Sequence, residues 1–104
     1  MPWVETIATE ELNESGTAQV VMEDGHKIAL IRIDNEVYAI NDTCSHAQAS
    51  LAEGEIVGDN IKCPLHGAEF DIRTGEVQSF PAVVGVANYE TRIENGKIYV
   101  DYEE

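Results

Sequence analysis

The sequence predicts an all-β protein on three observations. Short runs rich in β-branched and aromatic residues recur from end to end, turn-forming residues separate them, and no segment has a sustained 3.6-residue apolar period. The chain has 104 residues, 43% of them hydrophobic, which is enough for one core but too little for two. We therefore expect a single domain over residues 1–104.

The first half of the chain predicts strands joined by tight turns. Trp3 to Ile7 is expected to form an edge strand, and Thr9 to Leu12 one helical turn capped by Thr9. Alternating apolar residues and the turn dipeptides Asp24-Gly25 and Asp34-Asn35 then predict a run of hairpin strands. These strands cover residues 17–23, 27–33 and 37–40, with Ile28, Leu30 and Arg32 on one face of the second.

The second half divides into an irregular middle and a terminal hairpin. Between residues 40 and 81 turn formers multiply and only very short strands are expected. Strands over 86–93 and 97–102 flank Asn95-Gly96, the strongest short hairpin signal in the chain. We expect the irregular middle to carry the functional site, because chemistry is commonly placed on loops that a rigid sheet supports.

The charge is strongly unbalanced, with 20 Asp and Glu against 6 Lys and Arg and a formal net charge of −14. This argues against nucleic-acid binding, because a polyanion requires a basic face. The acidity either maintains solubility alone or favours a partner with a basic patch. Residues 1–10 lack the pattern of a secretory signal, and no run of about 18 apolar residues occurs. We therefore expect a cytoplasmic protein without a membrane span.

Four potential metal ligands stand in two short arms. The arms are Cys44-Ser45-His46 and Cys63-Pro64-Leu65-His66-Gly67, separated by residues 47–62. Thiols of cytosolic proteins are more often ligands or catalytic groups than disulfides. A structural zinc site would accept two Cys and two His, but zinc fingers usually group Cys with Cys and His with His. Mixed arms suit a Rieske [2Fe–2S] centre, in which two imidazoles replace two thiolates on one iron.

The two arms resemble the C-x-H and C-P-x-H-G boxes of Rieske proteins. The resemblance spans nearly the whole chain, and the chain is similar to soluble Rieske-type ferredoxins of bacterial aromatic-ring dioxygenase systems. It implies a Rieske fold of antiparallel β-sheets, sandwich- or barrel-like, with a cluster-binding subdomain of two loops over about residues 42–81. The matching positions outside the arms are Leu51, Glu53-Gly54, Phe70-Asp71, Thr74-Gly75 and Pro81-Ala82.

The resemblance also implies a cofactor and a role. One [2Fe–2S] cluster per chain would be held by Cys44 and Cys63 on the inner iron and by His46 and His66 on the outer iron. Electrons would come from an NAD(P)H-dependent flavoprotein ferredoxin reductase and pass to a terminal ring-hydroxylating oxygenase. The chain has no G-x-G-x-x-G and too few further histidines for a mononuclear iron, so we expect an electron carrier and not an enzyme. As an isolated small carrier, it is expected to be a monomer.

The neighbours of the arms indicate a low reduction potential. Ala49 and Leu65 stand where high-potential relatives have two extra cysteines, and Ala68 and Phe70 stand where they have Ser and Tyr hydroxyls aimed at sulfur. We expect a potential of about −150 mV, the low end of the Rieske range. Two alternatives stay open. One is a Rieske carrier for another oxygenase or a reductase, similar to a nitrite reductase small subunit, and the other is a zinc-stabilised interaction module.

Two further sets of residues receive expectations. His26 follows the predicted Asp24-Gly25 turn and is expected to be a solvated loop side chain. A group of acidic residues in the middle of the chain is expected either to be solvated individually or to form a negative collar that a basic partner would recognise. This group consists of Glu53, Glu55, Asp59, Glu69 and Asp71.

Overall fold

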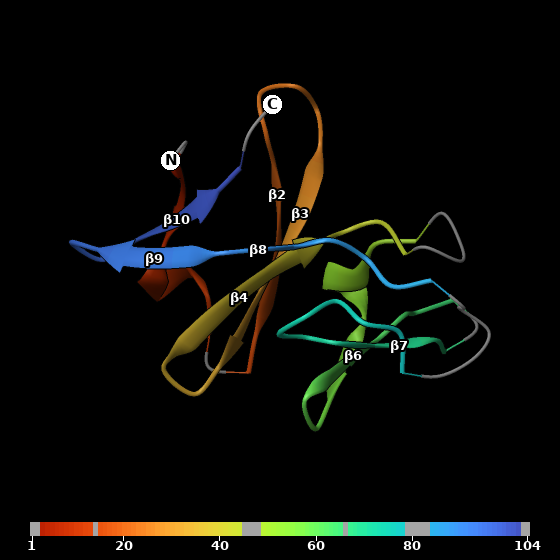
Figure 1. The fold of residues 1–104 in the computed structure, drawn as a ribbon. Helices are drawn as coiled ribbons and strands as arrows, with labels where there is room; N and C mark the ends of the chain where they lie inside the picture. The colour runs from red at the N-terminus through yellow and green to blue at the C-terminus, as the bar shows by residue number, and fades with distance from the viewer. Residues whose placement is uncertain (1–2, 14, 45–48, 66, 79–83, 103–104) are drawn as a thin grey trace.

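The computed structural model describes residues 3–13, 15–44, 49–65, 67–78 and 84–102 (Figure 1). These residues form ten strands in three antiparallel sheets, with two short 3-10 turns, which confirms the all-β prediction. The sheets have the strand orders β1-β10-β9, β2-β3-β4-β8 and β5-β6-β7. In the part of the chain that is described, no helix has the length and apolar character required to cross a membrane.

Two of the three sheets combine strands from distant parts of the chain, whereas the third is a local meander. The first sheet contains β1 (Trp3–Ala8), β9 (Thr91–Glu94) and β10 (Lys97–Asp101). The second contains β2 (Thr17–Val21), β3 (Lys27–Ile33), β4 (Glu36–Asn41) and β8 (Asn88–Tyr89). The third contains β5 (Glu55–Val57), β6 (Asn60–Lys62) and β7 (Glu69–Asp71), and the 3-10 turns are η1 (Thr9–Glu11) and η2 (Leu51–Glu53).

Strand β3 is buried on both faces, because the other two sheets lie on opposite sides of it (Figure 1). Ile28 and Leu30 share one face, as predicted, and pack in a core with residues of β10. Ala29 and Ile31 point the other way into a second core with residues of β6 and β7. All four side chains have no exposed area. This second core is the one that reaches the two cysteine arms.

The N-terminal helical turn forms where it was predicted, but the predicted cap is wrong. The residue that precedes the first turn is Ala8, whose backbone N–H donates to the Glu11 carboxylate at 2.8 Å. The Thr9 hydroxyl instead donates to the carbonyl of Gly96 at 3.3 Å. The backbone N–H of Thr9 binds the same carbonyl at 2.8 Å, so the turn before β10 places Thr9 outside the capping position.

The predicted strand over residues 86–93 is divided at Glu90. Its first part, β8, pairs with β4, and its second part, β9, pairs with β10, so the chain changes sheets between them. The carbonyl of Glu90 accepts the N–H of Asp101 at 3.0 Å. The hairpin at Asn95-Gly96 is confirmed, because both residues have the positive φ angles that a primed two-residue turn requires.

Candidate metal centre

Cys44 begins a loop that the backbone closes five residues later. Its N–H donates to the carbonyl of Ala49 at 3.0 Å. The next residues outward, Thr43 and Ser50, form an isolated antiparallel bridge. We call the segment between the closing residues, 44–49, loop 1.

Cys63 begins a second loop that closes in the same register. Its N–H donates to the carbonyl of Ala68 at 2.7 Å, and Lys62 pairs with Glu69 across β6 and β7. We call residues 63–68 loop 2. Within it Gly67 has a φ of +75°, a left-handed conformation that favours glycine. Loops 1 and 2 are therefore two hairpin tips of matching register, each with a cysteine as its first residue.

The two cysteine side chains meet in the second core. Cys44 is 4% exposed and Cys63 is 2% exposed, and both are free thiols. Both belong to the same buried cluster and each thiol senses the other, so loops 1 and 2 bring the two side chains together. Burial raises the pKa of the Cys63 thiol, whereas the backbone N–H of Leu65, directed at the sulfur, lowers it. Two buried sulfurs in one cluster, one of which receives an amide hydrogen bond, are a suitable donor pair for a soft metal centre.

The imidazole half of the predicted ligand set lies outside the described residues. His46 and His66 both belong to gaps in the description, as does Pro81 of the matching Pro81-Ala82 segment. The residues that are described contain no group of three or more His, Cys, Asp and Glu side chains placed to hold a metal ion. The structure therefore brings Cys44 and Cys63 together and leaves the two histidines as a prediction.

The flanks of the segment 79–83 lie against the third sheet. The N–H of Gln78 donates to the carbonyl of Glu69 at 2.7 Å, immediately after loop 2. The N–H of Val86 donates to the carbonyl of Gly75 at 2.8 Å. Gly75 has a φ of +79°, and a Cβ there would lie 2.0 Å from the Val86 carbonyl oxygen, so the two segments cross too closely for any side chain.

Asp42, which sequence analysis missed, is a buried residue that accepts several hydrogen bonds at the base of loop 1. Its Oδ1 accepts the hydroxyl of Ser50 at 2.8 Å and the backbone N–H of Ala52 at 3.0 Å, and its Oδ2 accepts the side-chain amide of Gln19 at 2.7 Å. Its backbone carbonyl accepts the N–H of Leu51 at 2.7 Å. The local sequence offers no signal for this role, because an Asp beside Asn41 is typical of an exposed turn.

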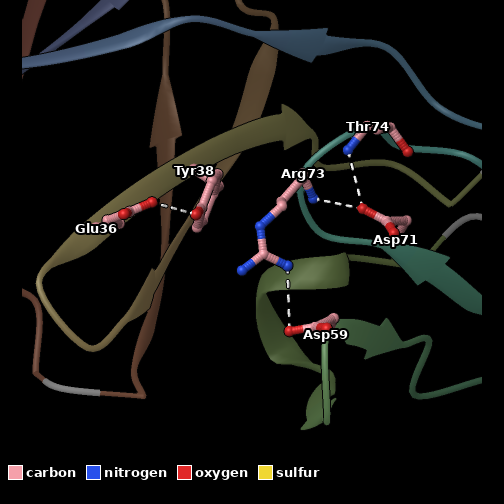
Figure 2. A network of polar contacts seen from close by, with 6 residues as sticks. All are labelled: Glu36, Tyr38, Asp59, Asp71, Arg73 and Thr74. Carbon is pink, nitrogen blue, oxygen red and sulfur yellow. Dashed lines mark hydrogen bonds and ion pairs between the residues drawn. The ribbon is translucent and has the colours of Figure 1, made fainter.

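Arg73 joins the third sheet to β4 (Figure 2). Its guanidinium lies 3.1 Å from the Asp59 carboxylate and over the ring of Tyr38, 5.2 Å from the centroid. The carboxylate of Asp71 accepts the backbone N–H of Arg73 at 2.8 Å and fixes the turn that presents it. The Tyr38 hydroxyl donates to the Glu36 carboxylate, which raises the pKa of that tyrosine.

The acidic residues of the predicted collar divide into two groups. Asp59 and Asp71 take part in the Arg73 network, and Glu69 accepts the Asn60 side-chain amide at 3.2 Å. Glu53 and Glu55 are exposed and line a hollow of about 340 Å³ beside Cys63. Glu53 and Glu55 thus present their carboxylates on the η2–β5 side of loop 2, where Lys62 lines the same hollow.

The interpretation of His26 as a solvated loop side chain is wrong. Its ring stacks on Tyr102 with centroids 5.4 Å apart, and its Nε2 lies 3.2 Å from the Tyr89 hydroxyl. Tyr102 in turn donates to the Asp24 carboxylate at 2.6 Å. His26 follows its predicted turn, but β8 and the end of the chain cover its ring.

Comparison with known proteins agrees with this geometry. The Rieske [2Fe-2S] domain family matches residues 2–90. The ferredoxin component of the naphthalene 1,2-dioxygenase system of Pseudomonas putida is 32% identical over 99 residues, which cover 95% of this chain and 94% of the relative.

Two solved structures have the same fold. A ferredoxin of Sphingomonas yanoikuyae B1 has a TM-score of 0.91 at 29% identity and covers 97% of this chain and 99% of its own. The ferredoxin in a complex of reduced oxygenase and oxidized ferredoxin in carbazole 1,9a-dioxygenase has a TM-score of 0.88 at 34% identity, with coverages of 94% and 91%. The chain therefore belongs to the Rieske [2Fe-2S] domain family.

Proposed function

We propose that this chain is the ferredoxin of an aromatic-ring-hydroxylating dioxygenase system, a one-electron carrier and not itself a catalyst. The observation that carries the proposal is the pair of buried, adjacent thiols of Cys44 and Cys63 at the start of two loops of matching register. A Rieske-type [2Fe–2S] cluster is the cofactor of the family and would supply the one-electron chemistry. We propose Cys44 and Cys63 as ligands of one iron, and His46 and His66 as ligands of the other.

The residues around Cys63 support a low potential. Ala68 and Phe70 are fully buried in the core that contains both cysteines, and neither side chain carries a hydroxyl. Hydrogen bonds to cluster sulfur stabilise the reduced state, so two absent hydroxyl donors disfavour reduction. The amide of Leu65 is a donor to the Cys63 sulfur that this chain retains. These features favour a potential near −150 mV, at the low end of the range of about −150 to +300 mV.

The surface next to loop 2 supports transfer to another protein. Leu65, within loop 2 and two residues after Cys63, is 47% exposed, so an apolar side chain faces solvent close to a proposed ligand. We propose a terminal oxygenase as electron acceptor and an NAD(P)H-dependent flavoprotein reductase as donor. The carbazole relative, solved with its oxygenase, supports the first of these partners. We further propose a cytoplasmic monomer whose cluster-binding subdomain covers about residues 42–81.

Iron and acid-labile sulfide analysis of anaerobically purified protein tests the proposal. We expect two iron and two sulfide per chain, a reddish-brown colour and an S = 1/2 electron paramagnetic resonance signal after dithionite reduction. The variants Cys44→Ala, Cys63→Ala, His46→Ala and His66→Ala should each lose the cluster. His26→Asn is the matched control and should retain full iron, because His26 packs on Tyr89 and Tyr102.

Two results would contradict the proposal. Colourless protein with one zinc per chain would support the zinc-stabilised interaction module instead. A midpoint potential above about +100 mV would contradict the low-potential assignment while leaving the cluster in place.

A further inference from the structure

Asp42 is the one charged side chain that is buried among the residues that the structure describes, with 1% of its surface exposed. It stands two residues before Cys44. Its three side-chain partners come from β2, from the residue that follows loop 1 and from η2, and they are Gln19, Ser50 and Ala52. Asp42 therefore ties the base of loop 1 to two neighbouring elements.

The carboxyl group of Asp42 is an acceptor in all three of its side-chain hydrogen bonds. The hydroxyl of Ser50, the backbone N–H of Ala52 and the side-chain amide of Gln19 donate to its two oxygens, an arrangement that suits a carboxylate. The ion pairs among the described residues involve Asp59 and Glu94, so no Lys or Arg in this part of the chain pairs with Asp42. The base of loop 1 consequently contains a buried carboxyl group without a Lys or Arg partner among the described residues.

Such a charge would act on a neighbouring redox centre. Two ferric ions, two sulfides and two thiolates give the oxidised Rieske centre a formal charge of zero, and reduction makes it negative. Repulsion between this added charge and a carboxylate is strong where little water screens it, whereas exposed carboxylates are screened by solvent and salt. Asp42 is 1% exposed and stands two residues before Cys44 in the chain, so little water screens a charge at this position.

We propose that Asp42 is a positioning residue for loop 1 whose buried negative charge lowers the reduction potential of the cluster. The inference rests on the proposed function, because it requires a redox centre at Cys44. It attributes part of the low reduction potential to Asp42, a residue outside the ligand set. The absent hydroxyls near Cys63 favour a low reduction potential as well.

Asp42→Asn tests the charge separately from the fold. The asparagine has the same shape, and its Oδ1 can still accept from Ser50 and Ala52. The Gln19 side chain can rotate so that its carbonyl oxygen accepts the new amide N–H. In cluster-loaded protein at a fixed applied potential, we expect the ratio of reduced to oxidised protein to rise about tenfold, or about 59 mV for one electron. Iron content and the resonance spectrum should remain those of the wild type.

Two controls separate the charge from other causes. Glu53→Gln removes the same charge from an exposed position in η2 and should change the ratio less than twofold. Ser50→Ala removes a hydrogen bond but keeps the Asp42 charge, so the ratio should stay within twofold or fall.

The outcomes are distinct. A ratio within twofold of wild type in Asp42→Asn, with the cluster intact, would overturn the inference and leave the proposed function standing. A rise in Ser50→Ala equal to that in Asp42→Asn would also overturn it, because loop distortion would then be the cause. Wild-type protein without iron and sulfide would instead remove the proposed function itself.

Discussion

Loops 1 and 2 share a register but have differently built bases. The base of loop 1 is polar, because the buried carboxylate of Asp42 collects donors from β2, Ser50 and η2. The base of loop 2 is apolar, since Ile61, Phe70 and Ile72 are all fully buried around it. Two loops of matching backbone register can thus be supported by different chemistry.

The difference follows from where each loop leaves the sheets. Loop 2 connects β6 and β7, whose backbone groups are already paired, so its support can consist of side-chain packing. Loop 1 leaves the end of β4 and leads into η2, whose N-terminal amides need partners. Asp42 supplies acceptors for Leu51 and Ala52. The consequence is electrostatic, because only loop 1 acquires a buried charge among the described residues.

Phe70→Ala should break the base of loop 2 and have the largest effect on stability. Phe70 is fully buried, and truncation of a buried Phe costs about 3–5 kcal/mol through lost transfer energy and the cavity left behind. We expect the free energy of unfolding in urea to fall by this amount, with loss of iron from the weakened loop. Ile93→Ala is the control at a 46% exposed position and should cost about 1 kcal/mol or less. A loss below about 1.5 kcal/mol for Phe70→Ala would show that loop 2 does not depend on its apolar base.

The sequence predicts the hairpins and the cysteine pair because both depend on local or chemical constraints. Asn95-Gly96 specifies its own turn geometry, and the mixed Cys-His arms indicate a ligand set whose members must meet. The structure places Cys44 and Cys63 in one buried core, which is compatible with the sulfur half of that set, and their role as ligands stays a prediction.

The features that the sequence did not predict depend on distant partners. The strand expected over 86–93 divides at Glu90 because its two parts pair with different sheets. Asp42 is buried because Gln19, 23 residues earlier, lies over it. His26 is covered by Tyr102, which is near the other end of the chain. In each case a tertiary contact overrides what the local residue pattern indicates.

Arg73→Gln should weaken the contact between the third sheet and β4 while leaving the residues of both loops unchanged. The Asp59–Arg73 ion pair is half exposed and the cation–π contact with Tyr38 is modest, so we expect a loss of about 1 kcal/mol or less that shrinks in high salt. Amide hydrogen exchange should accelerate in β5 to β7 and remain unchanged in β9 and β10.

Arg92→Gln is a matched control for this experiment. Arg92 pairs with Glu94 at 3.4 Å and lies over Trp3, 4.8 Å from the ring centroid, so the same two kinds of contact are removed in the first sheet. Its exchange pattern should be the reverse, faster in β9 and β10 and unchanged in the third sheet. Equal acceleration of the third sheet in both variants would show that Arg73 has no special role in holding loop 2 to the rest of the molecule.

Tyr102→Phe should have the smallest effect, and one that depends on pH. The Tyr102 hydroxyl, followed by the backbone N–H of His26, lowers the pKa of Asp24 below its ordinary value. A lowered folded-state pKa means that the unfolded chain binds the proton more readily. The contribution to stability is therefore present above about pH 4, and it disappears as the pH falls through the folded-state pKa.

The variant should consequently be less stable than the wild type at pH 7 and approach it as the pH is lowered below about 4, as measured by urea unfolding at a series of pH values. Iron content and reduction potential should not change, because Tyr102 packs in the core that does not contain the two cysteines. A stability difference that stays constant across the series would show that the effect of the lost hydroxyl does not depend on the ionisation of Asp24. A shift in potential would show that the two cores are coupled, and the contrast between loops 1 and 2 would then need a cause beyond their own bases.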